Sequence, residues 1–262
     1  MLHVATKSSA RAPVEATWRP TPKFVLRLAC IREVTADWPP GRFVEAGAGT
    51  ATLTRTFLNR GFTGTCYDIT PETRAVIRRN VADKADVVDV PESADDIALG
   101  AYDYLFAFEV LEHIQDDLGA LRMWTPWLRP HGRVLVSVPA HQRKYGPVDV
   151  SVGHVRRYER AELESLLAAA GYVDIEVRNY GFPLGNVLRI SQNLANRVLR
   201  RGASDKRSFV ERSVDSGVKT SKGGLRIAPL VSEWTLAPFV AMQRRVYTRE
   251  LGDGFVATAR KV

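Results

Sequence analysis

Residues 43–51 read Phe-Val-Glu-Ala-Gly-Ala-Gly-Thr-Ala, an apolar run that ends in two glycines separated by one alanine. The run Arg42–Ala46 predicts a buried strand, and the spacing of Leu53 and Phe57 predicts a helix over Thr50–Asn59. Small residues at such a junction let a ligand approach the backbone closely, and the first amide hydrogens of the helix face polar ligand groups. The stretch therefore predicts a ligand site at the first turn of a βα unit.

The same alternation of strand and helix continues along the chain. It predicts an α/β fold with a Rossmann-like, mostly parallel sheet that carries helices on both faces. The tract between Tyr180 and Gly252 lacks this rhythm, so we expect a helical insertion before the last strand, with helices near Asn186–Leu199 and Leu236–Arg249. The other expected strands are Thr65–Ile69, Asp86–Val90, Tyr102–Phe108, Arg133–Val138, Val173–Val177 and Gly254–Lys261, and the other expected helices are Pro71–Val81, Ile114–Leu128 and Arg160–Ala170.

An acidic residue, Asp68, ends the second expected strand. It follows the glycines by about 20 residues, where a carboxylate accepts hydrogen bonds from both hydroxyls of a ribose, which predicts an adenosine cofactor. NAD and S-adenosylmethionine both fit this geometry. The dinucleotide pattern needs a third glycine, but Thr52 stands in its place. Glu45 would repel a pyrophosphate and suits the ammonium of a methionine moiety, directly or through water, so S-adenosylmethionine is favoured.

Three more stretches follow in order: residues 88–90 (Val-Asp-Val), residues 106–113 (Phe-Ala-Phe-Glu-Val-Leu-Glu-His) and residues 128–133 (Leu-Arg-Pro-His-Gly-Arg). With them, the chain resembles the class I S-adenosylmethionine-dependent methyltransferases of the small-molecule type. The resemblance covers about residues 42–177 and the final strand. It implies a seven-stranded sheet whose last strand is antiparallel.

The resemblance also implies roles for individual residues. The glycine turn approaches the methionine part of the cofactor, Asp68 binds the ribose, residues 89 and 90 contact the adenine, and the end of the fourth strand flanks the cofactor. Ala51 is a departure, because many members carry glycine there, and alanine is tolerated if its backbone is helical. The predicted cofactor site comprises Glu45, Gly47, Ala48, Gly49, Asp68, Ile69, Asp89, Val90, Phe108 and Glu109.

Candidates for the acceptor site follow the fourth and fifth strands, because loops at the carboxyl ends of parallel strands line the ligand crevice. A base is needed only where the acceptor must lose a proton. The candidate catalytic residues are His141, His154 and His113, with a hydrogen-bonding or surface role as the alternative for each. The candidate substrate-binding residues are Gln142, Tyr145, Arg156, Arg157 and Tyr158; the arginines bind an acidic acceptor or, alternatively, pair with Glu159 or Glu162.

A Glu-x-x-Glu-His spacing at Glu109, Glu112 and His113 would put three metal-ligand types on one helix face. A few methyltransferases that resemble this chain use such a cluster for a divalent metal. Two carboxylates and one imidazole need further ligands, and most members with a similar stretch are metal-independent. We therefore predict no metal cofactor.

The composition is that of an ordinary globular protein, with 45% hydrophobic and 25% charged residues in 262. Two cysteines, Cys30 and Cys66, make no disulfide framework. Residues 1–11 lack the apolar core of a signal peptide, and no apolar run approaches the roughly 20 residues that span a bilayer. We expect a cytoplasmic protein without a membrane span, as a monomer or homodimer.

The net charge of +8 is concentrated in residues 200–226, which carry eight basic against three acidic residues. Three interpretations remain open for this segment: a solvated loop, a gate that attracts an anionic acceptor, or a contact for nucleic acid or lipid headgroups.

We expect residues 1–40 to form an N-terminal helical segment over the cofactor site, residues 41–180 and 250–262 the cofactor-binding core, and residues 181–249 a substrate-binding lid. The predicted function is in-line transfer of a methyl group from S-adenosylmethionine to a small-molecule acceptor, on a carboxylate or hydroxyl oxygen, in natural-product or secondary metabolism.

Two alternatives remain. A nucleic-acid methyltransferase would explain the basic charge, but the fourth strand does not end in the Asn/Asp-Pro-Pro-Tyr stretch used for exocyclic base amines, which disfavours a nucleic-acid partner. The other alternative is a non-catalytic scaffold that binds S-adenosylmethionine, against which the intact glycine turn and Asp68 weigh.

Overall fold

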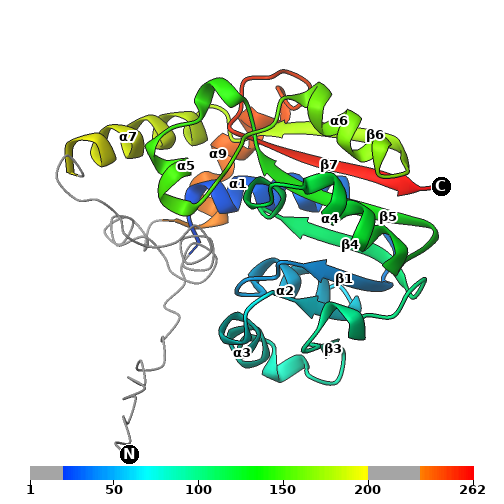
Figure 1. Cartoon of the computed structure of the whole chain (residues 1–262). Helices are drawn as coiled ribbons and strands as arrows, with labels where there is room; N and C mark the ends of the chain where they lie inside the picture. Colours follow the sequence, from blue (N-terminus) through cyan, green and yellow to red (C-terminus); the bar gives the residue numbers. More distant parts are fainter. Residues whose placement is uncertain (1–19, 200–230) are drawn as a thin grey trace, which may run out of the picture.

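The computed structural model describes residues 20–199 and 231–262, which build a seven-stranded sheet (Figure 1). The strands are β1 (Arg42–Ala46), β2 (Thr63–Tyr67), β3 (Val88–Asp89), β4 (Tyr102–Phe108), β5 (Leu128–Pro139), β6 (Tyr172–Tyr180) and β7 (Gly254–Lys261). They lie in the order β3-β2-β1-β4-β5-β7-β6. β7 is antiparallel to β5 and β6, and the pairs among β1 to β5 are parallel. This confirms the predicted Rossmann-like sheet with an antiparallel last strand.

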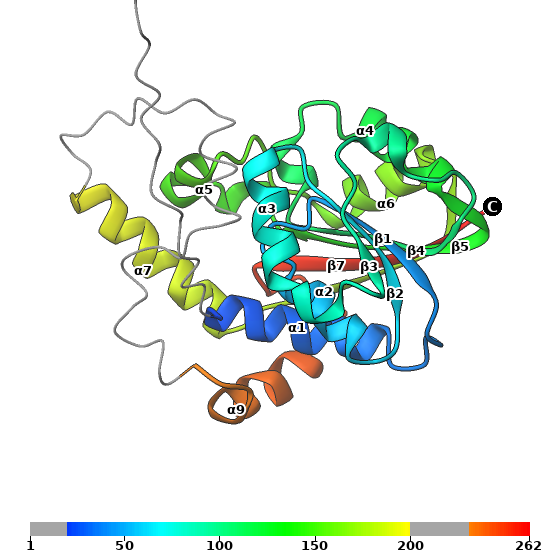
Figure 2. The same ribbon diagram turned by 90° about the horizontal axis from the view of Figure 1, so that it is seen from below.

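Helices cover both faces of the sheet. They are α1 (Pro22–Val34), α2 (Thr52–Leu58), α3 (Pro71–Asn80), α4 (Asp117–Trp124), α5 (Pro147–Val152), α6 (Arg160–Ala169), α7 (Leu184–Leu199) and α9 (Glu233–Arg244). Seen edge-on, α4 and α6 lie on one side of the sheet and α1 lies on the other (Figure 2).

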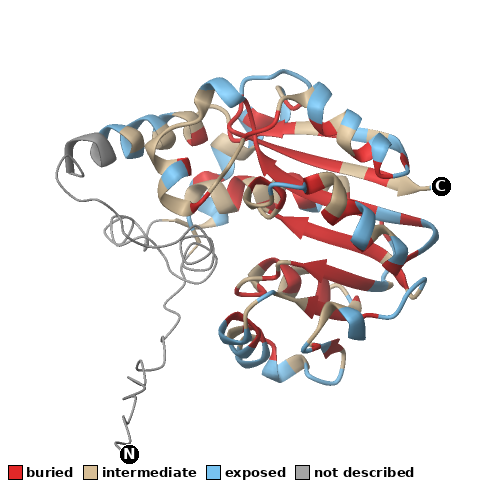
Figure 3. Ribbon diagram, in the orientation of Figure 1, coloured by how far each residue is buried: buried red, intermediate tan, exposed pale blue. Residues whose placement is uncertain are grey.

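Successive residues of a strand alternate between the two layers, as the pleat requires. In β1, Val44 joins the cluster that contains Leu121 of α4, whereas Phe43 joins the cluster that contains Leu26 of α1 and Phe57 of α2. The central strands β1 and β4 are therefore buried on both faces (Figure 3). This burial explains why they read as continuous apolar runs in the sequence.

Several predicted boundaries were wrong for local reasons. The helix expected from Ile114 begins at Asp117, because Asp116 accepts a hydrogen bond from the Gly119 amide over 2.8 Å and caps it. Its end at Trp124 gives way to a short 3₁₀ turn that contains Pro126. The fifth strand extends to twelve residues, because its ends pair with β4 and β7 beyond the expected core.

The N-terminal helix α1 lies beside the helices of the insertion. Thr21 caps it by accepting a hydrogen bond from the Phe24 amide, and Pro22 occupies the first turn, where no amide hydrogen is needed. α1 contacts α7, α9, β6 and β7, and α7 also contacts α5. The basic segment at residues 200–226 lies outside the described residues, as do residues 1–19.

Within the described part of the chain, no helix combines the length and the apolar character that crossing a bilayer demands.

Candidate active site

The glycine turn after β1 has a backbone that requires glycine at Gly47. Its φ is +71°, and a Cβ there would lie 2.6 Å from Cγ2 of Val110. The amides of Gly47 and Ala48 both donate to the Tyr67 carbonyl, over 2.9 and 3.1 Å, which ties the turn to β2. Gly49 also has a positive φ, of 55°. The turn therefore presents backbone and no side chain at Gly47 and Gly49.

The expectation for Ala51 was wrong. Its backbone is left-handed, with φ 55° and ψ 24°, and it precedes the first residue of α2. An alanine in this region costs about 1–2 kcal/mol relative to right-handed backbone. The buried methyl group packs in the core cluster of α1 and α2, which offsets part of that cost. This left-handed residue also explains why α2 begins at Thr52 and not at Thr50.

Asp68 follows β2 directly and faces the glycine turn. Its Oδ2 accepts a hydrogen bond from the Gly49 amide over 3.1 Å. Burial raises the pKa of Asp68, and hydrogen bonds from the amides of Gly49, Ile69 and Thr70 oppose that rise. The next side chain, Ile69, is 66% exposed.

Glu45 lies inside β1 and is buried. The Thr54 hydroxyl of α2 donates a short hydrogen bond to its Oε2. Burial raises the pKa of Glu45 to about 8, with the Thr54 hydrogen bond and the charge of Arg27 acting in the opposite direction. The carboxyl group of Glu45 thus forms its hydrogen bond within the protein, to Thr54. A contact of Glu45 with the methionine ammonium stays a prediction.

The remaining predicted cofactor residues lie at the ends of β3 and β4. Asp89 is exposed and Val90 is half-buried. Phe108 is buried, and its ring stacks near the rings of Phe57 and Phe106. The structure therefore places these residues at the carboxyl edge shared with the glycine turn, where parallel α/β sheets bind ligands.

Glu109, the residue after β4, is held by basic side chains of α1. Lys23 Nζ lies 3.1 Å from its Oε2, and Arg27 Nη1 lies 3.2 Å from its Oε1. The buried Tyr180 hydroxyl donates to Oε1 over 3.3 Å. Burial opposes ionisation, but the charges of Lys23 and Arg27 outweigh it and hold the pKa of Glu109 well below its usual range. The sequence motifs missed Lys23 and Arg27, because α1 reaches Glu109 only through tertiary packing.

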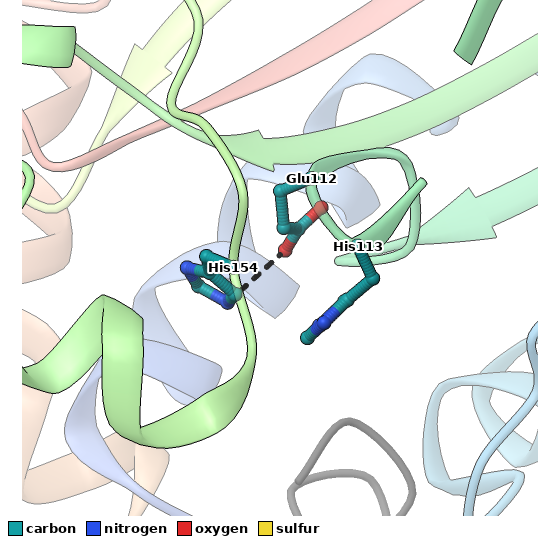
Figure 4. A group of neighbouring side chains, drawn as sticks. All are labelled: Glu112, His113 and His154. Carbon is teal, nitrogen blue, oxygen red and sulfur yellow. Dashed lines mark ion pairs between the residues drawn. The ribbon is translucent and has the colours of Figure 1, made fainter. Parts of the chain in front are cut away.

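A second polar group forms at Glu112, His113 and His154 (Figure 4). Glu112 is wholly buried, and its Oε1 lies 3.7 Å from Nε2 of His154. The rings of His113 and His154 meet edge to face, with centroids 4.8 Å apart. Burial, and then the neighbouring His154, lowers the pKa of His113 to about 4. Burial and the charge of Glu109 raise the pKa of Glu112 well above its usual range.

The predicted helix face for Glu109, Glu112 and His113 was wrong. Leu111–His113 is a single 3₁₀ turn, and Glu109 precedes it with φ +56°. Glu109 therefore pairs with α1, and His154, from the loop after α5, takes the place beside Glu112. The sequence could not predict that His154 would lie beside Glu112. The two residues are more than forty positions apart, and no local pattern links them.

His141 lies away from this group. It is 2% exposed, and its Nδ1 lies 3.0 Å from Oε2 of Glu159. Its ring meets Phe255 edge to face, with centroids 5.4 Å apart. Its Nε2 is buried without a hydrogen-bond partner among the described residues. A direct catalytic contact by His141 stays a prediction.

The two predicted substrate arginines are engaged in ion pairs. Arg156 Nη1 lies 2.8 Å from Oδ2 of Asp117. Arg157 is buried, and its Nε and Nη1 lie 2.8 and 3.2 Å from carboxylate oxygens of Asp149 and Asp253. Both arginines therefore pair with aspartates rather than with the expected glutamates, Glu159 and Glu162.

The other substrate candidates separate into two places. The Tyr145 hydroxyl donates to the His154 carbonyl over 2.7 Å, so it supports the loop that carries His154. Gln142 and Tyr158 line a surface pocket of about 600 Å³ together with Arg156, Arg157 and residues of α4 and α6. None of the predicted cofactor residues lines that pocket.

The parallel sheet with its antiparallel final hairpin, the glycine turn after β1 and the acidic residue after β2 define an α/β enzyme with an adenosine-containing cofactor. A family model described as a methyltransferase domain matches residues 18–177, more than half of the chain. The chain therefore belongs to the methyltransferase-domain family, the class I S-adenosylmethionine-dependent methyltransferases, and S-adenosylmethionine is its cofactor.

Individual relatives agree with this family. A ubiquinone biosynthesis O-methyltransferase from Xanthomonas campestris pv. campestris is 29% identical over 103 residues, which are 38% of this chain and 43% of that protein. The match thus spans less than half of the curated relative.

Solved structures share the fold. Phosphoethanolamine N-methyltransferase 2 from Haemonchus contortus, solved with S-adenosylmethionine, superposes with a TM-score of 0.55 at 18% identity over 90% of this chain and 52% of that chain. The 1,6-didemethyltoxoflavin-N1-methyltransferase from Burkholderia thailandensis superposes with a TM-score of 0.50 at 18% identity over 91% of this chain and 78% of that chain.

Proposed function

We propose that this protein transfers the methyl group of S-adenosylmethionine to a hydroxyl or carboxylate oxygen of a small molecule. The observation that carries the proposal is the contact between the glycine turn and Asp68, with Gly49 N 3.1 Å from Asp68 Oδ2. This contact joins a turn that has no side chain at Gly47 and Gly49 to a carboxylate at the ligand-binding edge of the sheet.

The residues at this edge fit the cofactor. Asp68 has acceptor capacity for ribose hydroxyls beyond its bond to Gly49, and the exposed Ile69 offers apolar surface to the adenine. The ammonium of the methionine moiety would favour the ionised form of Glu45, whose pKa burial raises to about 8. Lys23 and Arg27, which lie beside Glu109, offer positive charge that suits the methionine carboxylate.

Oxygen is the acceptor atom that we favour. The relative from Xanthomonas is named as an O-methyltransferase, which supports an oxygen acceptor. S-adenosylmethionine supplies a methyl group activated by the positive sulfur. A bond forms between the acceptor oxygen and the methyl carbon as the carbon–sulfur bond breaks, and a hydroxyl acceptor releases its proton to water.

The insertion at residues 181–249 would act as the lid in this proposal, and residues 1–40 would cover the cofactor. Two facts support it: α1 bears the cations beside Glu109, and α7 and α9 both contact α1. Closing such a lid would exclude water from the transferred methyl group.

Calorimetric titration of the purified protein with S-adenosylmethionine, S-adenosylhomocysteine and NAD tests the cofactor. We expect the first two to bind and NAD not to bind. Transfer of labelled methyl to phenols and carboxylic acids, with total RNA as the competing acceptor, then tests the reaction. Labelling of RNA alone would favour the nucleic-acid alternative, and binding without any transfer would favour a scaffold.

A further inference from the structure

We propose that Glu112, His113 and His154 form a binding site for one divalent transition-metal cation of the zinc or manganese type. Each side chain offers one ligand atom, and the three atoms lie within 4.8 Å of one another. The two rings lie next to each other beneath the Glu112 carboxylate in the view of Figure 4.

The carboxylate of Glu112 is unsatisfied without such a cation. The residue is 0% exposed, and neither of its oxygens has a hydrogen-bond partner among the described residues. Burying a carboxyl group in this way is costly, because its hydrogen bonds to water are lost and nothing replaces them. The nearest basic side chains of α1, Lys23 and Arg27, form their ion pairs with Glu109. A cation beside Glu112 would favour the ionised carboxylate and give its oxygens a partner.

His113 is oriented as a metal ligand. Its Nδ1 lies 2.9 Å from the Gly153 carbonyl, and a carbonyl oxygen only accepts, so Nδ1 carries the proton. In a neutral ring, the lone pair then lies on Nε2. A hydrogen bond from the other ring nitrogen to a carbonyl is the usual support of a metal-bound histidine.

His154 has the same arrangement with a carboxylate in place of the carbonyl. Its Nδ1 lies 2.9 Å from Oδ1 of Asp149, so in a neutral ring Nδ1 carries the proton and Nε2, on the side of Glu112, carries the lone pair. Asp149 is fully buried and is itself held by the Arg157 guanidinium and the Gly146 amide, over 2.8 and 2.9 Å. The ring of His154 is therefore fixed by a carboxylate–histidine pair of the kind found behind metal ligands.

The donor set selects the class of metal. Two imidazoles and one carboxylate suit zinc and neighbouring transition metals, and a magnesium ion prefers oxygen ligands. Metal–ligand bonds of about 2.0–2.2 Å put two ligand atoms at most about 4.4 Å apart, so small side-chain rotations suffice to close the site. His113 and His154 are only partly buried, which leaves a side open to further ligands.

The open side gives the cation a role that rests on the proposed function. A hydroxyl oxygen of the acceptor bound there would lose its proton to water at lower pH, which exposes the lone pair that attacks the methyl carbon. This would add a metal to an enzyme for which the sequence predicted none. Glu109, included in the sequence motif, is replaced by His154 because Lys23 and Arg27 engage it.

Calorimetry on the full chain, freed of metal by a chelator that is then removed, tests the site with Zn²⁺ alone. We expect about one equivalent to bind, affinity at least about 100-fold lower in Glu112→Gln and in His154→Gln, and much weaker binding of Mg²⁺. Glu250→Gln is the matched control, because it removes a carboxylate from the other histidine–carboxylate group, His141, Glu159 and Glu250, and should leave Zn²⁺ binding unchanged.

Absence of Zn²⁺ binding, or equal binding by wild type and Glu112→Gln, would overturn the proposal. If these variants do not fold, nitrogen NMR of the wild-type imidazoles decides, because Zn²⁺ should shift Nε2 of two histidines that keep a proton on Nδ1. Shifts of His141 alone would also overturn it. Zn²⁺ binding without methyl transfer would support the metal site and contradict the proposed function. Methyl transfer by a protein that binds no metal would support the proposed function and contradict the metal site.

Discussion

Replacing Arg157 by methionine should destabilise the fold strongly. The guanidinium is 4% exposed and lies between two buried carboxylates, Asp149 and Asp253, which are 0% and 2% exposed. It also donates to the Ala140 carbonyl over 3.1 Å. Its loss removes the cation that the two carboxylates share, although Asp149 keeps His154 and the Gly146 amide and Asp253 keeps Arg189. Because the broken pairs are buried, we expect a cost of about 3 kcal/mol, or roughly 10 °C in Tm for a chain of this size.

Urea unfolding followed by tryptophan fluorescence measures this cost, because Trp124 and Trp127 are buried in the core. Arg156→Met is the matched control. Arg156 is about one-third exposed, and its partner Asp117 keeps a hydrogen bond from the Tyr158 hydroxyl, so this change should cost about 1 kcal/mol or less.

A different outcome would refute the structural role of Arg157. If Arg157→Met unfolds at the same urea concentration as wild type, while KM for an acidic acceptor rises and S-adenosylmethionine still binds, the guanidinium binds the acceptor as the sequence suggested. If both arginine variants lower the free energy of unfolding equally, the burial of an ion pair does not determine how much it contributes to stability.

Three further predictions follow from the cofactor edge. Asp68→Ala should weaken S-adenosylmethionine binding by about 10²–10⁴-fold in calorimetry, since two charge-assisted hydrogen bonds of about 1.5–3 kcal/mol each are lost; Asp86→Ala, which removes an exposed carboxylate before the amino end of β3, should bind normally. Gly47→Ala should lower Tm more than Gly100→Ala, because both backbones have positive φ, but only at Gly47 does the new Cβ meet a side chain, at 2.6 Å; equal losses would contradict the predicted clash. For Glu45, the folded-state pKa of about 8 exceeds the ordinary 4.5, so the folded state holds the proton more tightly and the free energy of unfolding falls as pH rises from 4.5 to about 8. Glu45→Gln should flatten that decline in urea titrations across this pH range, and an unchanged slope would mean that Glu45 is not buried as described.

The sequence predicted well those features that depend on neighbouring residues. The strand–turn–helix at residues 43–51 combines an apolar run, two glycines and a helical period, all of which are local properties. The position of Asp68 beside the glycine turn could also be predicted. One βα unit separates Asp68 from the glycines, and the parallel pairing of β1 with β2 aligns the ends of the two strands. The left-handed backbone of Ala51 could not be predicted, because alanine rarely adopts this conformation. Here the packing of the buried methyl group offsets part of its cost.

The polar groups around the site were predicted less well, and for one physical reason. A sequence shows which side chains are charged, but a buried charge takes whichever partner the fold brings within about 3 Å. Glu109 meets Lys23 and Arg27 across 86 and 82 positions, and Arg157 meets Asp253 across 96. Such contacts have no spacing rule, because they arise only after helices and loops pack.

The sequence by itself determined the order of strands and helices, the glycine turn and the class of cofactor, because hydrophobic period and backbone preference act over a few residues. Only the tertiary structure decided that Glu109 pairs with α1, that Arg157 is part of a buried ion-pair network, and that His154 joins Glu112 and His113. Those outcomes depend on desolvation, because a charged group that loses water on burial is stabilised by the partners that lie near it in space and not by its neighbours in the sequence.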